Sequence, residues 1–292
     1  MDTITHTLFG IGIYKAINKE KMSKKEKRAL LFTSIGASQI PDIDVISQLW
    51  DTAGLYQMWH RGITHSVFLV PVWAFLFFII NRLFFRIKSW PFFWIAFLAV
   101  FIHDTSDVFN AWGTGYLEPF SSARLTFGTI SIIDFVIWFI FLLTFVASKV
   151  RKEIKEYRLY RIGWAVILFH VMLQSIQGYI LYKQYKPRYE QVALSASFVP
   201  WNYSIIGKNG ENVDIIDDSL LTKERLLYRL QSGSESSLEA LFTQNPKART
   251  LYEWSPFVVV VDNGRQLGIY DPRFYRKGQS FLFEYIEKTQ ER

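Results

Sequence analysis

The sequence predicts a membrane α-helical domain of about four long spans plus two shorter N-terminal helices, followed by a small soluble α+β domain. Half of the 292 residues are hydrophobic, and the apolar residues gather in segments of bilayer length. After residues 186–187 (Lys-Pro) the pattern becomes alternating, polar and rich in β-forming residues. We therefore expect a helical membrane domain at 1–186 and a soluble domain at 187–292.

Four apolar segments reach the length of about 17–25 residues that a membrane helix needs. We expect shorter or half-depth helices at two apolar stretches that come before them, 4–17 and 29–40. The first residues lack the basic region and cleavage site of a secretory signal, so the spans themselves are expected to direct insertion. The four long candidates are 67–85, 90–109, 127–147 and 162–182.

The net charge of +7 is concentrated between the spans. Segments 18–28 and 149–161 each carry six basic and two acidic residues, whereas segments 41–63 and 110–126 hold one arginine each. By the positive-inside rule the basic segments face the cytoplasm. We expect a multi-pass protein of the cytoplasmic (inner) membrane whose C-terminal domain lies outside the cytoplasm. The alternative, binding of nucleic acid or anionic headgroups, lacks a recognised binding fold, and no nucleic-acid partner is expected.

The C-terminal domain reads as hairpins and short helices. Asn-Gly pairs within 201–217 and 257–270 separate alternating apolar residues, the strongest short signal for a hairpin. Segments 223–231 and 236–242 look helical. The domain shows no catalytic motif, and an unknown protein is one partner it could bind.

The membrane half has few ionisable side chains outside its basic loops, and they fall in short motifs. A charged residue within a span costs about 2.5–3.5 kcal/mol, so a functional role is the default expectation. His103 and Asp107 are four residues apart, which on a helix places both on one face. That spacing suits two ligands of one metal ion, although a histidine–aspartate hydrogen bond or a helix cap would also explain it.

Other segments bring similar groups to the same membrane level. Asp42 and Asp44 could converge on a cation or could cap a turn. His60 and His65 lie at the start of one span, and Asp134 lies near the start of another. Asp134 could cap that second helix, but Thr129 and Ser131 are the more natural caps and leave Asp134 as a surplus acid. In the predicted topology these groups, with His103 and Asp107, all lie at the outer face, which favours a metal site over independent caps. His170 lies mid-span and is either a hydrogen-bonding group between helices or a neighbour that supports the site.

The order of these motifs resembles a family of the YdjM/YfhP type, described as LexA-binding, inner-membrane-associated, metal-dependent hydrolases. The likeness covers residues 1 to about 135, and a less distinctive YDPRF segment resembles the tail of Bacillus-type members. The His-x-x-x-Asp spacing is more weakly similar to zinc-dependent phospholipase C enzymes. The motifs are MDTITHTLFG at 1–10, PDID at 41–44, HRGITHS at 60–66, HDTSD at 103–107 and GTGYLEPFSSARLTFGTISIID at 113–134.

The resemblance implies a metal-centred role for seven residues and a neighbouring role for four more. In one departure from the family pattern, Phe135 stands where a proline is expected after Asp134. The implied metal residues are His6, Asp42, Asp44, His60, His65, His103 and Asp107, and the implied neighbours are Asp2, Arg61, Asp104 and Asp134.

The sequence therefore predicts a membrane-embedded metal-dependent hydrolase that acts on a lipid or lipid-linked phosphoester at the outer face. Without cysteine, the ligands are nitrogen and oxygen, which suit zinc first, with manganese or iron as alternatives and two or more ions within the ligand capacity. Arg61 is expected to clamp a phosphate, Asp104 to act as base or orient His103, and Asp134 to assist catalysis. A metal-stabilised scaffold without catalysis is the main rival. A metal transporter is disfavoured because the polar groups gather at one face.

Overall fold

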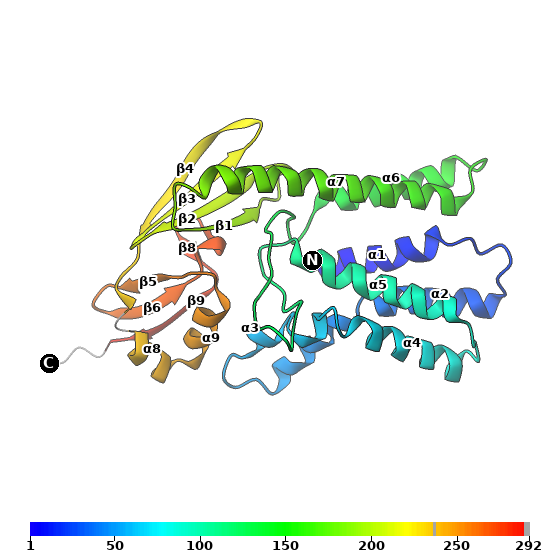
Figure 1. Cartoon of the computed structure of the whole chain (residues 1–292), viewed down its shortest axis with the longest axis horizontal. Helices are drawn as coiled ribbons and strands as arrows, with labels where there is room; N and C mark the ends of the chain where they lie inside the picture. The colour runs from blue at the N-terminus through cyan, green and yellow to red at the C-terminus, as the bar shows by residue number, and fades with distance from the viewer. Residues whose placement is uncertain (236–237, 289–292) are drawn as a thin grey trace. The chain divides into compact units, whose positions relative to one another are not determined.

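The computed structural model describes residues 1–235 and 238–288, and the chain groups into two compact units (Figure 1). The first unit comprises Met1–Asp44 and Arg61–Ser175, and the second comprises Val45–His60 and Ile176–Arg292. Each unit has its own core and is described by itself. The predicted domain boundary at 186/187 stays a prediction.

The first unit is helical. Two of its helices are long and apolar enough to cross a membrane, α5 and α7; α4 would add a third only if it were continuous with the short helices of 56–65. Because α4 has 15 residues and α6 has 16, the prediction of four long spans is not confirmed. The elements are α1 (Thr3–Ala16), α2 (Lys24–Ala37), η1 (Ile40–Leu49), η2 (Ile63–His65), α4 (Val70–Phe84), α5 (Trp90–Val108), α6 (Phe135–Val150) and α7 (Glu156–Tyr185).

Local sequence explains where these helices begin. Ser23 and Glu26 form a reciprocal capping box at the start of α2, and Pro91 occupies the first turn of α5, where its missing N–H costs nothing. Gly10 lets α1 approach α2 closely, because a side chain there would meet the backbone of Ile35 at 2.7 Å. The core of α1, α2, α4 and α5 combines small alanines with Phe77 and Val100.

The start of α6 corrects the predicted third span. Residues 127–134 are apolar but not helical, because the backbone N–H groups of Phe127, Thr129 and Ile130 donate to the carbonyls of Val108 and Phe109. Hydropathy does not register these backbone hydrogen bonds. The helix therefore begins at Phe135, eight residues later than predicted.

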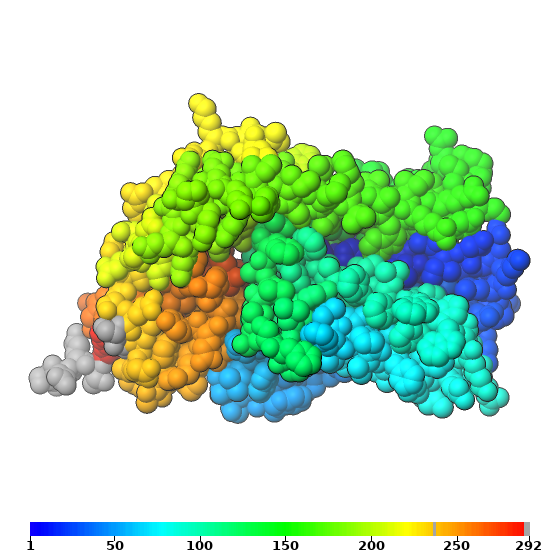
Figure 2. Space-filling model, viewed as in Figure 1, coloured from blue at the N-terminus to red at the C-terminus, as the bar shows by residue number. Residues whose placement is uncertain are grey.

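The side chains on the outer side of the helices are apolar, as expected for a surface in contact with lipid. On α7, which is green in Figure 2 and forms part of the visible surface, Leu168 is 70% exposed and Phe169 is 55% exposed. Phe139 and Leu142 on α6 are also more than half exposed. Such a continuous exposed apolar surface marks an interaction with membrane or protein.

The described part of the second unit contains antiparallel sheets and the short helices α3 (Tyr56–Trp59), α8 (Leu238–Gln244) and α9 (Pro246–Trp254). The last residues of η1, from Val45, and of α7, from Ile176, also group with it. One sheet has the order β1-β2-β3-β4 and another the order β5-β6-β9. Both predicted hairpins are confirmed: β2 and β3 turn at Gly210, whose φ is +53°, and β5 and β6 turn at Gly264, whose φ is +78°. The strands are β1 (Gln191–Ala196), β2 (Tyr203–Asn209), β3 (Asn212–Ser219), β4 (Thr222–Gln231), β5 (Val259–Asp262), β6 (Gln266–Tyr270), β7 (Tyr275–Arg276), β8 (Gln279–Ser280) and β9 (Phe283–Glu287).

The predicted helix at 223–231 is wrong, because this segment forms strand β4. Its residues favour helices, but β4 pairs along its length with β3, and tertiary pairing overrides local propensity. The cross-strand partners Asp214 and Arg229 also form an ion pair, with 2.8 Å between Oδ1 and Nε. Residues 238–242 of the predicted helix at 236–242 belong to α8, which begins at Leu238. Positions 236 and 237 lie outside the described residues.

Candidate metal centre

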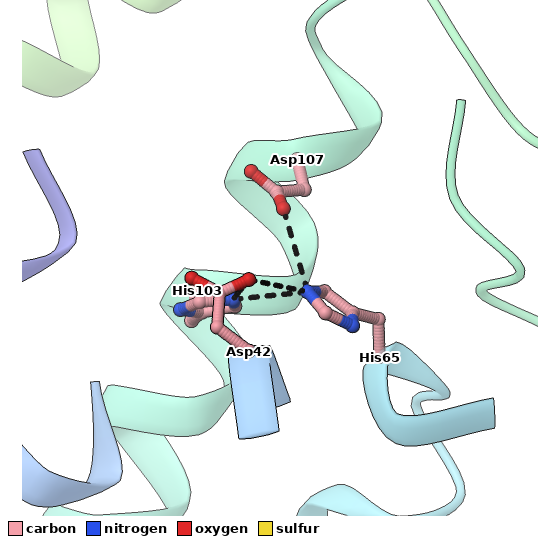
Figure 3. A group of neighbouring side chains, drawn as sticks. All are labelled: Asp42, His65, His103 and Asp107. Carbon is pink, nitrogen blue, oxygen red and sulfur yellow. Dashed lines mark hydrogen bonds and ion pairs between the residues drawn. The ribbon is translucent and has the colours of Figure 1, made fainter. Parts of the chain in front are cut away.

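Four side chains of the first unit converge at one point (Figure 3). Asp42 comes from η1, His65 from η2, and His103 and Asp107 from successive turns of α5. Each offers one ligand atom, and these atoms lie within 4.8 Å of one another. The side chains of His65, His103 and Asp107 are fully buried, whereas that of Asp42 is 22% exposed. The group could hold a metal ion, with Asp42 on its open side.

Both histidines turn the same ring nitrogen, Nε2, toward the centre. Nδ1 of His103 lies 2.7 Å from the carbonyl oxygen of Ser38, which only accepts hydrogen bonds. Nδ1 of His65 lies 3.1 Å from Thr64 Oγ1, which gives its own proton to Asp44 Oδ2, and 3.4 Å from that Oδ2, so both neighbours act as acceptors toward it. In the neutral rings Nδ1 therefore carries the proton, and Nε2 presents a lone pair. This is the usual arrangement of metal-binding histidines, whose other nitrogen donates to a carbonyl or carboxylate.

The four ligand atoms are spaced as ligands of one ion would be. The Nε2 atoms of His65 and His103 are 3.2 Å apart, and Nε2 of His65 is 3.3 Å from Asp42 Oδ1 and 3.6 Å from Asp107 Oδ2. Tetrahedral bonds of about 2.0–2.1 Å place neighbouring ligand atoms about 3.3 Å apart. Two lone pairs and two carboxylate oxygens meet there with no donor among them, so a cation fits this donor set.

His6 approaches the other oxygen of Asp107. Its Nε2 is 3.3 Å from Asp107 Oδ1, and its ring stacks on that of His103 with 3.7 Å between centroids. The amino group of Met1 contacts the same oxygen. His6 is thus placed beside the four-residue group rather than in it, and its role as a ligand stays a prediction.

Arg61 is buried and contacts the same oxygen of Asp107 that faces His65. Its Nε is 3.0 Å from Asp107 Oδ2, while Nη1 donates to Asn110 Oδ1 and Nη2 to the carbonyl of Met1, each at 2.9 Å. Its backbone adopts a φ of +57° and donates to Asp44 Oδ2. These contacts fit a residue that positions Asp107, and the predicted phosphate clamp stays a prediction. Sequence reasoning missed Asn110, although its place three residues after Asp107 was a usable signal.

Asp44 supports His65, and its predicted role as a metal ligand stays a prediction. Asp44 accepts hydrogen bonds from the Arg61 backbone and from Thr64 and lies against Nδ1 of His65, so it orients that ring. The prediction that Asp104 orients His103 is wrong, because the carbonyl of Ser38 fills that position. Asp104 is buried, and neither of its oxygens has a hydrogen-bond partner among the described residues.

Asp134 is a helix cap, contrary to the prediction that Thr129 or Ser131 would take that role. Its Oδ1 accepts from the backbone of Val136 and Ile137, and its Oδ2 lies 3.0 Å from Nε2 of His170. Asp2 caps α1 in the same way. The catalytic role of Asp134 and the supporting roles of Asp2 and His170 stay predictions.

His60 belongs to the part of the chain that groups with the second unit. It follows α3 directly, and its ring stacks on that of Tyr56 with 5.2 Å between centroids. Its predicted role as a metal ligand stays a prediction.

We expect Asp134→Ala to lower stability without loss of metal. The substitution removes an N-cap, worth about 0.5–2 kcal/mol, and the partner of the buried His170. Asp134→Asn is the matched control, because asparagine caps helices as well as aspartate does. In detergent the thermal unfolding temperature should be highest for the wild type, lower for Asp134→Asn and lowest for Asp134→Ala. The metal content of all three proteins should be the same. Loss of metal in both variants would place Asp134 in the centre itself.

Comparison with known proteins supports the motif-based resemblance. The family model described as YdjM inner membrane protein matches residues 1–181. A curated relative, the uncharacterized protein YfhP of Bacillus subtilis (strain 168), is 33% identical over 138 residues, which cover 46% of this chain and 42% of that relative. The match thus spans less than half of the relative's length. No solved structure matches. The predicted family resemblance is confirmed.

Proposed function

Because the chain belongs to the family of the YdjM inner membrane protein, we propose that it is a membrane-embedded, metal-dependent hydrolase. Its substrate would be a lipid or lipid-linked phosphoester, cleaved at the outer face of the membrane. The observation that carries the proposal is the convergence of four acceptor atoms, from Asp42, His65, His103 and Asp107, with no donor among them. Zinc is the ion we favour, since nitrogen and oxygen ligands in tetrahedral spacing suit it.

The residues divide into those that bind and those that hold the binders in place. His65, His103, Asp42 and Asp107 would bind the ion, Asp44 and the Ser38 carbonyl fix the two rings, and Arg61 fixes Asp107. A divalent cation held there supplies Lewis-acid chemistry, which polarises the scissile group and activates water at neutral pH.

Hydrolysis also needs an acceptor for the proton of the attacking water. The water oxygen bonds to phosphorus, the bond from phosphorus to the alcohol oxygen breaks, and the alcohol leaves with a proton. Asp104 is the candidate base, because it is adjacent to His103 and its carboxylate oxygens have no hydrogen-bond partner among residues 1–235 and 238–288. Asp42 marks the side from which water reaches the centre, since it is the member of the four-residue group that solvent reaches.

Metal analysis and phosphate release together test the proposal. Protein purified in detergent should carry about one divalent cation or more per chain and release phosphate or a phosphorylated headgroup from a membrane phospholipid panel. Asp104→Asn should retain the metal and lose turnover. A wild type that keeps stoichiometric metal but cleaves no phosphoester or ester, with no cellular defect in His65→Ala, would end the enzyme proposal.

A metal-stabilised scaffold is the second candidate, favoured by one observation. Four protein ligands can fill a tetrahedral shell, which is the closed arrangement of structural sites, whereas catalysis needs an open position. Imidazole or phosphate added to a cobalt-substituted protein would alter the visible absorption only if a ligand position is open. An unchanged spectrum would favour the scaffold.

The outer-face assignment predicts the result of reporter fusions. Fusions after residues 25, 115 and 292 should report cytoplasmic, external and external positions, because the basic segments stay inside. Alkaline phosphatase is active outside and a fluorescent reporter inside, so the pair gives opposite signals at each point. A cytoplasmic tail at residue 292 would contradict the predicted topology.

A further inference from the structure

A large apolar groove runs through the first unit beside the metal centre. It encloses about 890 Å³, within the range of about 300–1,000 Å³ typical of small-molecule sites. Helices α1, α5 and α7 form most of its lining, with Ile130 and with Ile137 of α6. On the three helices its walls include Phe9, Ile13, Leu98, Ile102, Trp164 and Leu168.

The groove is polar at one end only. Thr105 and Ser106 are the polar residues of its described lining, and both hydroxyls bond elsewhere, to Tyr116 and to the His103 carbonyl. In the sequence both lie between the ligands His103 and Asp107, neither of which lines the groove. Met1 also lines the groove, and its amino group contacts Asp107. Met1 therefore joins this end of the groove to the centre, and an occupant would have an apolar body and place its polar end beside Met1.

The dimensions of the groove match a lipid chain lying in a bilayer. Its lining on α5 extends from Pro91 to Phe109, about 27 Å at 1.5 Å per residue, close to the hydrocarbon thickness of about 30 Å. Both α5 and α7 are candidate membrane spans, so hydrocarbon is the medium around them.

A second protein helix would fit the lining less well than a lipid chain. Helices pack closely in membranes where small residues line the contact, whereas this wall is mostly bulky, with Phe9, Trp94, Phe101 and Trp164.

We infer that this groove binds one hydrocarbon chain of the lipid substrate and presents the phosphorylated headgroup to the metal centre. As a substrate subsite, the inference rests on the proposed function. The chain is held by apolar contact along α5 and α7, and the headgroup end lies where Met1 borders Asp107.

Photo-crosslinking to a lipid chain tests this directly. The full-length protein is placed in nanodiscs of phosphatidylethanolamine and phosphatidylglycerol, with a trace of phosphatidylglycerol that carries a diazirine near the end of one acyl chain. Mass spectrometry then maps the adducts. They should concentrate on groove residues of α5 and α7, and Leu98→Trp, which fills the groove, should reduce them severalfold. Leu143→Trp is the matched control, because Leu143 is similarly exposed, at 50% against 48%, but lies outside the groove.

The outcomes separate this inference from the proposed function. Ala165→Trp fills the groove from α7 and replaces Leu98→Trp if that variant does not fold. Adducts spread evenly over α4 and α6, or crosslinks between two copies of the chain through the groove, would overturn the inference. Groove adducts that persist in His65→Ala, together with absent hydrolysis in the wild type, would sink the enzyme proposal and leave the chain site standing.

Discussion

Alanine at His65 is expected to remove the bound divalent cation. Nε2 of His65 is within 3.2–3.6 Å of the ligand atoms of the other three residues, so it is central to the group. Its loss leaves two carboxylates and the imidazole of His103 as ligands, and it removes the ring that Asp44 orients. Metal content after gel filtration, measured by plasma mass spectrometry, should fall from about one ion per chain to a small fraction of that.

Two further variants make the result specific. His170→Ala removes a buried histidine that pairs with Asp134 outside the group, and it should keep its metal. Asp44→Asn leaves all four ligands but weakens the support of His65, so metal affinity should fall about 10–100-fold, as for other partners of ligating histidines. Equal metal content in the wild type and in His65→Ala would remove the basis of the metal centre.

The site could be predicted from sequence where spacing and topology carry the information. The four-residue interval of His103 and Asp107 predicted one face of a helix, and both side chains point to the same centre from α5. The predicted membrane level of PDID, His65 and HDTSD indicated a shared location, and the structure brings Asp42, His65 and α5 together. Periodicity and hydropathy depend on residue type alone, so one sequence is enough for them.

Contacts made by backbone atoms could not be predicted in this way. The Ser38 carbonyl that orients His103 and the Met1 carbonyl that accepts from Arg61 carry no signature, because every residue has a carbonyl. The cap at Asp134 was missed for a related reason: hydropathy extended the helix back to residue 127, where hydrogen bonds to Val108 and Phe109 hold the chain in a non-helical conformation. Strand β4 was missed because its pairing with β3 is a tertiary contact.

Replacement of Arg61 by alanine is expected to destabilise the helical unit strongly. The guanidinium is buried and contacts Asp107, Asn110 and the Met1 carbonyl, so its removal leaves the buried Asp107 carboxylate with the Met1 amino group but without its guanidinium partner. Breaking a buried pair from one side costs about 3–5 kcal/mol. Thermal unfolding in detergent and chelator should show a large drop. Arg151→Ala is the surface control, since that arginine and Glu153 are both more than 60% exposed and such pairs contribute about 0–1 kcal/mol.

Added metal should reveal what Arg61 does. A divalent cation neutralises Asp107 from the side of His65, so metal should restore part of the stability lost in Arg61→Ala, and more than it adds to Arg151→Ala. The unfolding temperature of Arg61→Lys should lie between those of the wild type and Arg61→Ala, because lysine keeps the charge but cannot reach three partners at once. If Arg61 instead served only to clamp a substrate phosphate, Arg61→Ala would unfold at the wild-type temperature, keep its metal and raise only the KM for a phosphoester. That pattern would support the role that the sequence predicts for Arg61, a clamp for the substrate phosphate.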